Sequence, residues 1–116
     1  MIITLSKPPS VNHLYKYTCR GGYARSYVSK EGLAWIEEAG WKLKSQWKKP
    51  TITGDLSLYI KLYYCGRYDI DNGNKALFDL FTKMGVIEDD SQIVFLQIEK
   101  IKVKHRTDEK IEIEIP

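Results

Sequence analysis

The sequence is poor in the residues that build zinc sites, disulfide frameworks or membrane spans. Its two cysteines, Cys19 and Cys65, lie far apart and form no C-x-x-C pair, so neither a zinc site nor a structural disulfide is expected. The two histidines, His13 and His105, are isolated, which leaves no Ser/His/Asp or Cys/His set for nucleophilic catalysis. No apolar stretch approaches the ~20 residues of a membrane span, and the N-terminal MIITL is too short for a signal peptide. We therefore expect one domain, residues 1–116, in a reducing cytoplasm.

Charge is mild overall but unevenly distributed. The net charge is +3, yet residues 1–50 hold nine Lys or Arg against three acids, a balance of +6. Residues 51–116 hold nine basic residues against twelve acids, a balance of −3. A basic half beside an acidic cluster fits a protein that binds a polyanion and also holds cations. The alternative is a solvated surface whose charges are merely uneven.

Apolar periodicity predicts two helices. Ser29 fits the N-cap of the first, and Pro50 follows its expected end. In the second, apolar residues recur at i, i+3, i+4 and i+7, and Gly85 supplies the stop. The predicted helices span residues 29–48, with Leu33, Ile36, Gly40, Leu43 and Trp47 on the apolar face, and residues 71–84, with Leu77, Leu80, Phe81 and Met84.

Alternation of apolar and polar residues predicts the strands. Residues 53–64 place Leu56, Leu58, Ile60 and Leu62 on one face. The pattern predicts an α+β fold, with a single-layer mixed sheet of about four or five strands covered by two helices. The other expected segments are strands at 1–5 and 23–28, an irregular stretch at 15–22 with a Gly21-Gly22 turn, and a hairpin of strands 94–104 and 110–115.

An acidic pair, Asp69 and Asp71, lies where the strand at 53–64 gives way to a helix. D-x-D is how a calcium-binding EF-hand loop begins, but such a loop needs a turn glycine at position 6 and a glutamate at position 12. Counted from Asp69, position 6 is Asn74 and position 12 is Leu80. An EF-hand is therefore excluded.

A second acidic turn, Glu88-Asp89-Asp90, follows the same helix. A helix of 14 residues is about 21 Å long, so its two ends cannot meet. Between Gly85 and Asp90, however, the chain can turn back along the helix. We therefore expect Asp90 to approach the helix's first turn and join Asp69 and Asp71.

Clustered carboxylates repel one another unless cations neutralise them. Oxygen ligands without Cys or His select Mg²⁺ or Mn²⁺, which bind one or two carboxylates together with substrate phosphate. Lys75, one turn beyond Asp71, could pair with Asp71 or reach that phosphate. The alternative is structural: Asp71 is the helix N-cap, Asp69 interacts with the helix dipole, and the second turn is only solvated.

Several segments together resemble the RusA family of Holliday-junction endonucleases, which many phages and prophages encode. They are "PPSVNHLY", "YVSKEGLAW", "DIDNGNKALFDLFTKMGVIEDDSQI" and a following "EKI" strand. The most specific part is D-x-D-N-x-x-K, then a helix, then G-x-x-x-D-D-x-Q, and the resemblance covers most of the chain in order. In this pattern, Asn72 is the asparagine that directly follows the second aspartate, and Asp89 matches a second acid beside Asp90.

The resemblance implies a homodimeric, Mg²⁺- or Mn²⁺-dependent endonuclease that cuts symmetrically across four-way DNA junctions in recombination and repair. By position, the family's metal-binding aspartates fall on Asp69, Asp71 and Asp90, and its catalytic lysine falls on Lys75. Two departures are visible. The basic run that precedes D-x-D in some members is reduced to Arg67, and Gly73 occupies a first-turn position where it should lower helix stability.

The basic N-terminal half suits contacts with a DNA backbone, and its interleaved tyrosines suit either base stacking or packing. An inactive DNA-binding or accessory module on the same scaffold is the alternative function. A D-x-D nucleotide-sugar transferase fits this length poorly, because 116 residues leave no room for a nucleotide-binding domain. The candidate DNA-contacting residues are Asn12, Lys16, Arg20, Arg25, Arg67 and Lys75.

Overall fold

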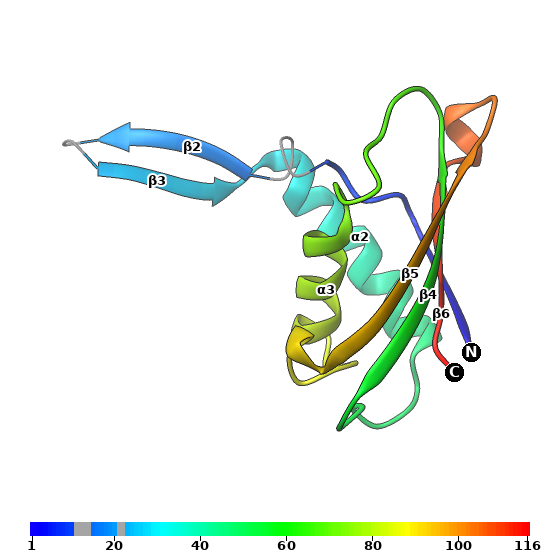
Figure 1. Ribbon diagram of the computed structural model, residues 1–116. Coiled ribbons are helices and arrows are strands. Elements are labelled where there is room, and N and C mark those ends of the chain that lie inside the picture. The colour runs from blue at the N-terminus through cyan, green and yellow to red at the C-terminus, as the bar shows by residue number, and fades with distance from the viewer. Residues whose placement is uncertain (11–14, 21–22) are drawn as a thin grey trace.

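The computed structural model describes residues 1–10, 15–20 and 23–116, with residues 15–20 and 23–27 described by their backbone alone. Two helices lie against a four-stranded mixed sheet of order β1-β6-β4-β5 (Figure 1). β1 pairs with β6 and β6 with β4 in antiparallel fashion, whereas β4 and β5 are parallel. The predicted α+β class is confirmed. The bounds are β1 Ile2–Leu5, α2 Lys30–Gln46, β4 Leu56–Tyr64, α3 Asn74–Lys83, β5 Ile93–Lys102 and β6 Lys110–Glu114.

A separate two-stranded hairpin, β2 (Tyr15–Arg20) with β3 (Tyr23–Val28), projects away from the sheet (Figure 1). The strand predicted at 23–28 is confirmed, but the prediction of an irregular segment from residue 15 is wrong. Tyr15 is paired with Val28 and Arg20 with Tyr23, so β3 supplies the ladder partner that β2 needs. The predicted glycine turn lies outside the described residues.

The predicted hairpin of the last two strands is also wrong. β5 and β6 lie on opposite sides of β4, so they are not neighbours. α3 provides the crossover that a parallel β4–β5 pair requires, and the chain then returns past β4 to pair on its other side. The loop between them contains a short 3-10 helix, η2 (Arg106–Asp108).

The core lies between the helices and one face of the sheet. The alternating leucines and isoleucine of β4 are buried there, as are Leu77, Leu80 and Phe81 of α3, all as predicted. Ser29 caps α2 by accepting a hydrogen bond from the Gly32 amide at 3.0 Å. The buried face of α2 is centred on Trp35, Ala39 and Leu43, and Leu33 is 57% exposed instead of buried. No described helix is long and apolar enough to cross a membrane.

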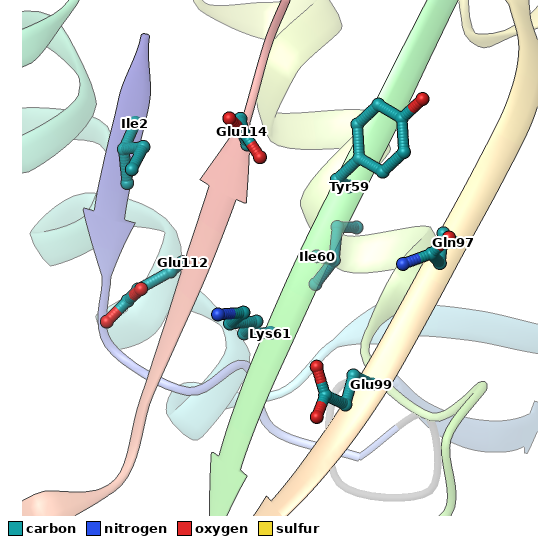
Figure 2. Close-up of a pocket in the computed structure, with 8 residues that line it drawn as sticks. All are labelled: Ile2, Tyr59, Ile60, Lys61, Gln97, Glu99, Glu112 and Glu114. Carbon is teal, nitrogen blue, oxygen red and sulfur yellow. The ribbon is translucent and has the colours of Figure 1, made fainter.

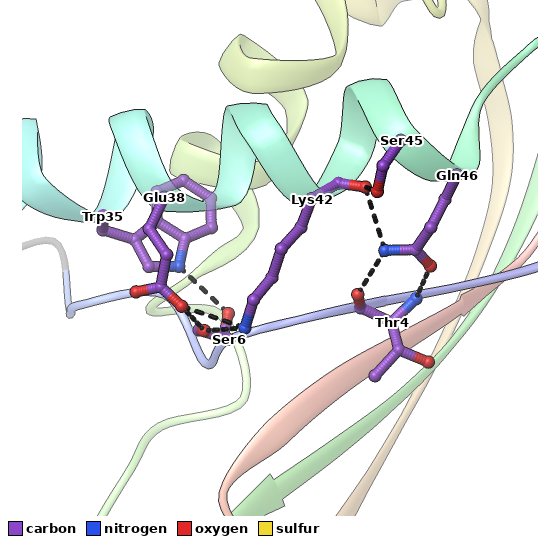
Figure 3. Close-up of polar contacts among 7 residues, drawn as sticks. All are labelled: Thr4, Ser6, Trp35, Glu38, Lys42, Ser45 and Gln46. Carbon is purple, nitrogen blue, oxygen red and sulfur yellow. Dashed lines mark hydrogen bonds and ion pairs between the residues drawn. The ribbon is translucent and has the colours of Figure 1, made fainter.

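Side chains of α2 fix β1 and the segment after it (Figure 3). Gln46 bonds both backbone groups of Thr4, at 2.8 Å each. The Trp35 indole donates to the Ser6 carbonyl at 3.0 Å, and the Ser6 hydroxyl donates to Glu38 at 2.6 Å. The segment that continues into Lys7 and Pro8 is therefore held against α2.

Candidate active site

The acidic pair lies in a turn between the end of β4 and the start of α3. The Asn72 amide donates to the Asp69 carbonyl at 3.1 Å, and the Asn74 amide donates to the Asp71 carbonyl at 3.4 Å. α3 begins at Asn74, three residues later than predicted, and its N-cap is Gly73, without a side-chain cap. Asp71 is therefore not the cap of this helix, and the capping alternative is wrong.

Both carboxylates face solvent. Asp69 and Asp71 are exposed. Within the described part of the chain, neither carboxylate accepts a hydrogen bond or forms an ion pair. Unpaired like charges this close in sequence leave their oxygens available to a cation. The donor set consists of carboxylate oxygen without thiol or imidazole, which fits Mg²⁺ or Mn²⁺.

A buried tyrosine, Tyr68, lies directly before this turn in the sequence and fixes its position. The Tyr68 hydroxyl donates to the Pro8 carbonyl at 2.8 Å. Burial, with a smaller effect from the charge of Glu109, raises the pKa of Tyr68 well above its ordinary value, so the hydroxyl stays a donor. A Cβ on Gly73 would lie 2.6 Å from the Tyr68 oxygen and 3.1 Å from Pro8 Cγ. The close approach of Tyr68 and Pro8 thus explains why glycine stands at this position.

An ion pair joins three distant segments beside Tyr68. Lys7 Nζ lies 2.7 Å from Glu109 Oε2, and the Cys65 amide donates to the same oxygen at 2.8 Å. Lys7 also lies 4.6 Å from the centre of the Tyr68 ring. Burial alone would raise the pKa of Glu109, but the bonds from Lys7 and Cys65, with the charges of Lys7 and Arg106, hold that pKa below its ordinary value. These contacts hold the segments of Lys7, Cys65 and Glu109 in place next to Tyr68, which precedes the acidic turn.

A hollow of about 740 Å³, whose lining holds three basic and three acidic side chains, adjoins the turn. Arg67, predicted to contact DNA, lines it together with Asn72 of the acidic turn. Lys7 and Arg106 line it too, and sequence reasoning did not identify them because their segments are distant in the chain. Glu31, Glu38 and Glu109 also contribute to the lining, but Glu38 and Glu109 are paired with Lys42 and Lys7. Because Lys7 is paired with Glu109, a phosphate backbone beside the two aspartates would contact mainly Arg67 and Arg106.

Asp90 lies at the other end of the sheet, so the expected approach to the first turn of α3 does not occur within one chain. It is the first residue of the short helix η1 (Asp90–Gln92), which leads into β5. Ile93 pairs with Leu56, at the start of β4, whereas Asp69 and Asp71 follow the end of β4. The ten residues of α3 lie between the two sites, roughly 15 Å at about 1.5 Å per residue. Among the described residues, no group of three His, Cys, Asp or Glu could hold a metal ion.

Specific bonds fix this placement. The Val86 amide donates to Phe81 O at 2.9 Å, and the Ile52 amide donates to Val86 O at 2.9 Å. Gln92 Nε2 donates to the Ile52 carbonyl at 2.9 Å. The chain leaving α3 is thereby held at the C-terminal end of that helix, where β5 begins.

Asp89 and Asp90, the adjacent aspartates of the turn that follows α3, differ in role. The Asp89 carboxylate accepts from the Ser91 amide at 3.1 Å, and Gln92 Oε1 accepts from the Asp89 amide at 3.0 Å, which together form a capping box. Hydrogen bonds donated by Ser91 lower the pKa of Asp89. Asp90 is exposed, and no described residue bonds its carboxylate. Asp89 therefore shapes the turn, and Asp90 is the one available to a ligand.

The remaining predicted residues are spread over two regions. Lys75 is exposed in the first turn of α3, close in sequence to Asp71. Lys16, Arg20 and Arg25 lie on the β2–β3 hairpin, away from the sheet (Figure 1). Asn12 lies outside the described residues. The hairpin carries a basic segment outward from the body of the protein.

Comparison with known proteins identifies the family. The family model of Endodeoxyribonuclease RusA matches residues 7–116. Crossover junction endodeoxyribonuclease RusA of Escherichia coli strain K12 is 34% identical over 103 residues, covering 87% of this chain and 82% of that protein. The proteins of the same name from Enterobacteria phage 82 and Shigella sonnei strain Ss046 are each 33% identical with the same coverage. An exposed aspartate pair, beside a hollow lined by Arg67 and Arg106, thus occurs in a chain that belongs to the RusA endodeoxyribonuclease family.

Proposed function

We propose that this protein is a metal-dependent endonuclease that resolves four-way (Holliday) DNA junctions by paired symmetric cuts. The observation that carries the proposal is the turn of Asp69 and Asp71, whose unpaired carboxylates adjoin the hollow lined by Arg67 and Arg106 in a chain of the RusA family. The family's named activity supports a DNA phosphodiester as substrate. The metal requirement rests on the donor set of the turn.

Different residues would bind the metal, stabilise charge on the phosphate and bind the flanking DNA backbone. Asp69 and Asp71 would hold Mg²⁺ or Mn²⁺, and Asp90, which lies beyond the other end of α3 in the same chain, would complete that site only from the partner chain of a dimer. When bound, the ion supplies a Lewis acid for the scissile phosphate and lowers the pKa of the attacking water. Lys75 would offset negative charge on the nonbridging oxygens, as a fixed cation does without further reorganisation. Arg67 and Arg106 in the hollow would bind the flanking phosphates.

The outward hairpin would supply a second DNA contact. Lys16, Arg20 and Arg25 provide three positive charges on β2 and β3, and Asn12 precedes them in sequence. Such contacts are made to the backbone, so they position the junction without reading its sequence. We further propose a homodimer, because two coordinated cuts across a junction need two active sites related by a two-fold axis.

The test compares a labelled four-way junction with a linear duplex of matched sequence, each with and without Mg²⁺. We expect paired nicks on the junction alone, and only with the metal. Asp71→Asn serves as the control against a contaminating nuclease. Junction binding without cleavage under any divalent ion would contradict the proposal and favour the inactive DNA-binding module.

A further inference from the structure

Ile70 lies at the tip of the acidic turn, between the two aspartates. The Asn72 amide closes the turn on the Asp69 carbonyl at 3.1 Å, which makes Ile70 and Asp71 its two central residues. Tight turns favour glycine, proline, asparagine, aspartate and serine, each of which stabilises the turn in its own way. A β-branched apolar side chain provides no such stabilisation. The turn therefore accounts for Asp71 and leaves Ile70 unexplained.

The packing of the fold does not account for Ile70 either. Ile70 is 45% exposed, and it belongs neither to the buried core nor to the partly buried apolar residues that pack against that core. The other exposed large apolar residues of the described chain lie at the N-terminus, in α2 or in strands of the sheet, where single exposed apolar side chains are ordinary. Tyr68 and Gly73 are buried on either side of the turn. Ile70 is thus presented at a fixed position between the two carboxylates.

A phosphodiester bound at Asp69 and Asp71 brings an apolar surface to Ile70. The scissile phosphate joins two sugars through their O3′ and O5′ atoms, so both sugars lie beside any phosphate at the site. Adjacent Cα atoms are about 3.8 Å apart, so Ile70 is close to both carboxylates. The carbon–hydrogen face of a deoxyribose is apolar, and its 2′ carbon lacks the hydroxyl that a ribose carries. An isoleucine at this position suits a sugar without a 2′ hydroxyl.

We propose that Ile70 packs against one of the two sugars that flank the scissile phosphate and makes the site selective for DNA over RNA at that nucleotide. A 2′ hydroxyl in this contact would lose water and gain no hydrogen-bond partner from the isoleucine, which is an unfavourable exchange. Ile70 is then a specificity-determining residue that transfers no proton. The inference rests on the proposed function, because it takes a phosphodiester at Asp69 and Asp71 as the substrate.

Junctions that carry a single ribonucleotide test this contact. The cut is first mapped on the all-DNA junction, and a ribonucleotide is then placed on the 5′ or the 3′ side of the scissile phosphate. We expect the kcat/KM of the wild type to fall about tenfold for one of these two junctions, because an unpaired hydroxyl is held against an apolar side chain. The matched substrate carries its ribonucleotide one helical turn away from the cut and should be cleaved like the all-DNA junction.

Substitutions at Ile70 separate this role from a structural one. Ile70→Ser provides a hydroxyl that can bond to the ribose, so the preference for deoxyribose should largely disappear, whereas Ile70→Leu keeps the apolar contact and should keep the preference. Because Ile70 does not pack against the core, Ile70→Ser should keep the melting temperature of the wild type.

Ile2→Ser is the matched control variant. Ile2 is also an exposed isoleucine, at 60%, but it lies on β1, beside Glu112 and Glu114 on the face of the sheet that the helices leave open (Figure 2). The variant should keep both the cleavage rate and the preference for deoxyribose.

Hydroxyl-radical footprinting provides a readout that needs no cleavage. These radicals attack the hydrogens of exposed sugars, and in EDTA the junction should be bound without being cut. We expect the wild type to protect one sugar beside the scissile phosphate. Ile70→Ser should leave that sugar exposed while the rest of the footprint stays the same.

The outcomes separate the two proposals. A wild type that cuts all of these junctions equally well, or an Ile70→Ser protein that slows all of them by the same factor, overturns the role of Ile70 and leaves the proposed function standing. A wild type that cuts no junction but protects a sugar at the branch point through Ile70 supports the contact and contradicts the proposed function. A wild type that neither cuts nor protects overturns both.

Discussion

The Tyr68 hydroxyl bonds the Pro8 carbonyl at 2.8 Å directly against Gly73, the N-cap residue of α3. This contact joins the N-terminal segment to the turn that carries Asp69 and Asp71. Because α2 holds that segment through Ser6 and Trp35, the position of the acidic turn depends on packing at a distance from it. Changes at Gly73 should therefore affect both stability and cleavage.

Gly73→Ala should destabilise the protein by about 1–3 kcal/mol, because the new methyl would lie 2.6 Å from the Tyr68 oxygen. Tyr68→Phe removes that oxygen and should cost about 1 kcal/mol alone, since it leaves the Pro8 carbonyl without its donor. The double variant should be more stable than the sum of the two single effects predicts, because the main clash is gone. Urea unfolding of the four proteins measures this coupling. Strict additivity would argue against a tight contact at Gly73.

Local patterns predicted much of the fold. The alternation in β4 and the helical periodicity before Gly85 indicate which face of each element is buried. Such a pattern depends on residues that are close together in the sequence, and so it could be predicted. The order of strands depends on tertiary pairing instead, and so β6 could not be placed beside β4 from its own sequence. The acidic pair was found because D-x-D is contiguous. The position of Asp90 and the contribution of Arg106 were not, because each depends on where a distant segment packs.

Glu109→Gln should remove a stabilising effect that depends on pH. The pKa of Glu109 is lower in the folded protein than its ordinary value of 4.5, so the carboxylate contributes stability above about that pH. The contribution disappears as pH falls through the lower, folded-state pKa. The difference in unfolding free energy between wild type and Glu109→Gln should therefore be constant near neutral pH and shrink below pH 4.5. A difference that does not change down to acid pH would contradict the Lys7–Glu109 pairing.

The adjacent aspartates of the second acidic turn should respond differently to substitution. Asp89→Asn keeps an oxygen that can accept from the Ser91 amide, so cleavage and stability should stay near wild type. Asp89→Ala should lower stability through loss of the cap. Asp90→Asn should abolish cleavage while leaving the melting temperature unchanged. Equal reductions of cleavage by Asp89→Asn and Asp90→Asn would contradict this division of roles.

Arg106→Ala should weaken junction binding and reduce its salt dependence. Each phosphate that the protein no longer neutralises makes the slope of log affinity against log salt shallower by about 0.9 on duplex arms. Arg67→Ala should behave in the same way, because both side chains line the hollow beside the acidic turn. Lys48→Ala, just beyond the end of α2 and outside the hollow, is the matched control. Titrations at several salt concentrations give the slopes, and an unchanged slope for Arg106→Ala would exclude the hollow as a DNA surface.

The most direct test of the metal site is Asp71→Asn, measured for junction cleavage, junction binding and stability in one preparation. The substitution keeps the shape of the side chain and removes the charge that would hold the cation. Because Asp71 caps no helix and bonds no described side chain, stability should change by less than about 0.5 kcal/mol. We expect cleavage to become undetectable while binding in the absence of Mg²⁺ is retained or strengthened, since one fewer negative charge faces the phosphates. An Asp71→Asn protein that cuts the junction at close to the wild-type rate would contradict the assignment of the acidic turn as the site of catalysis.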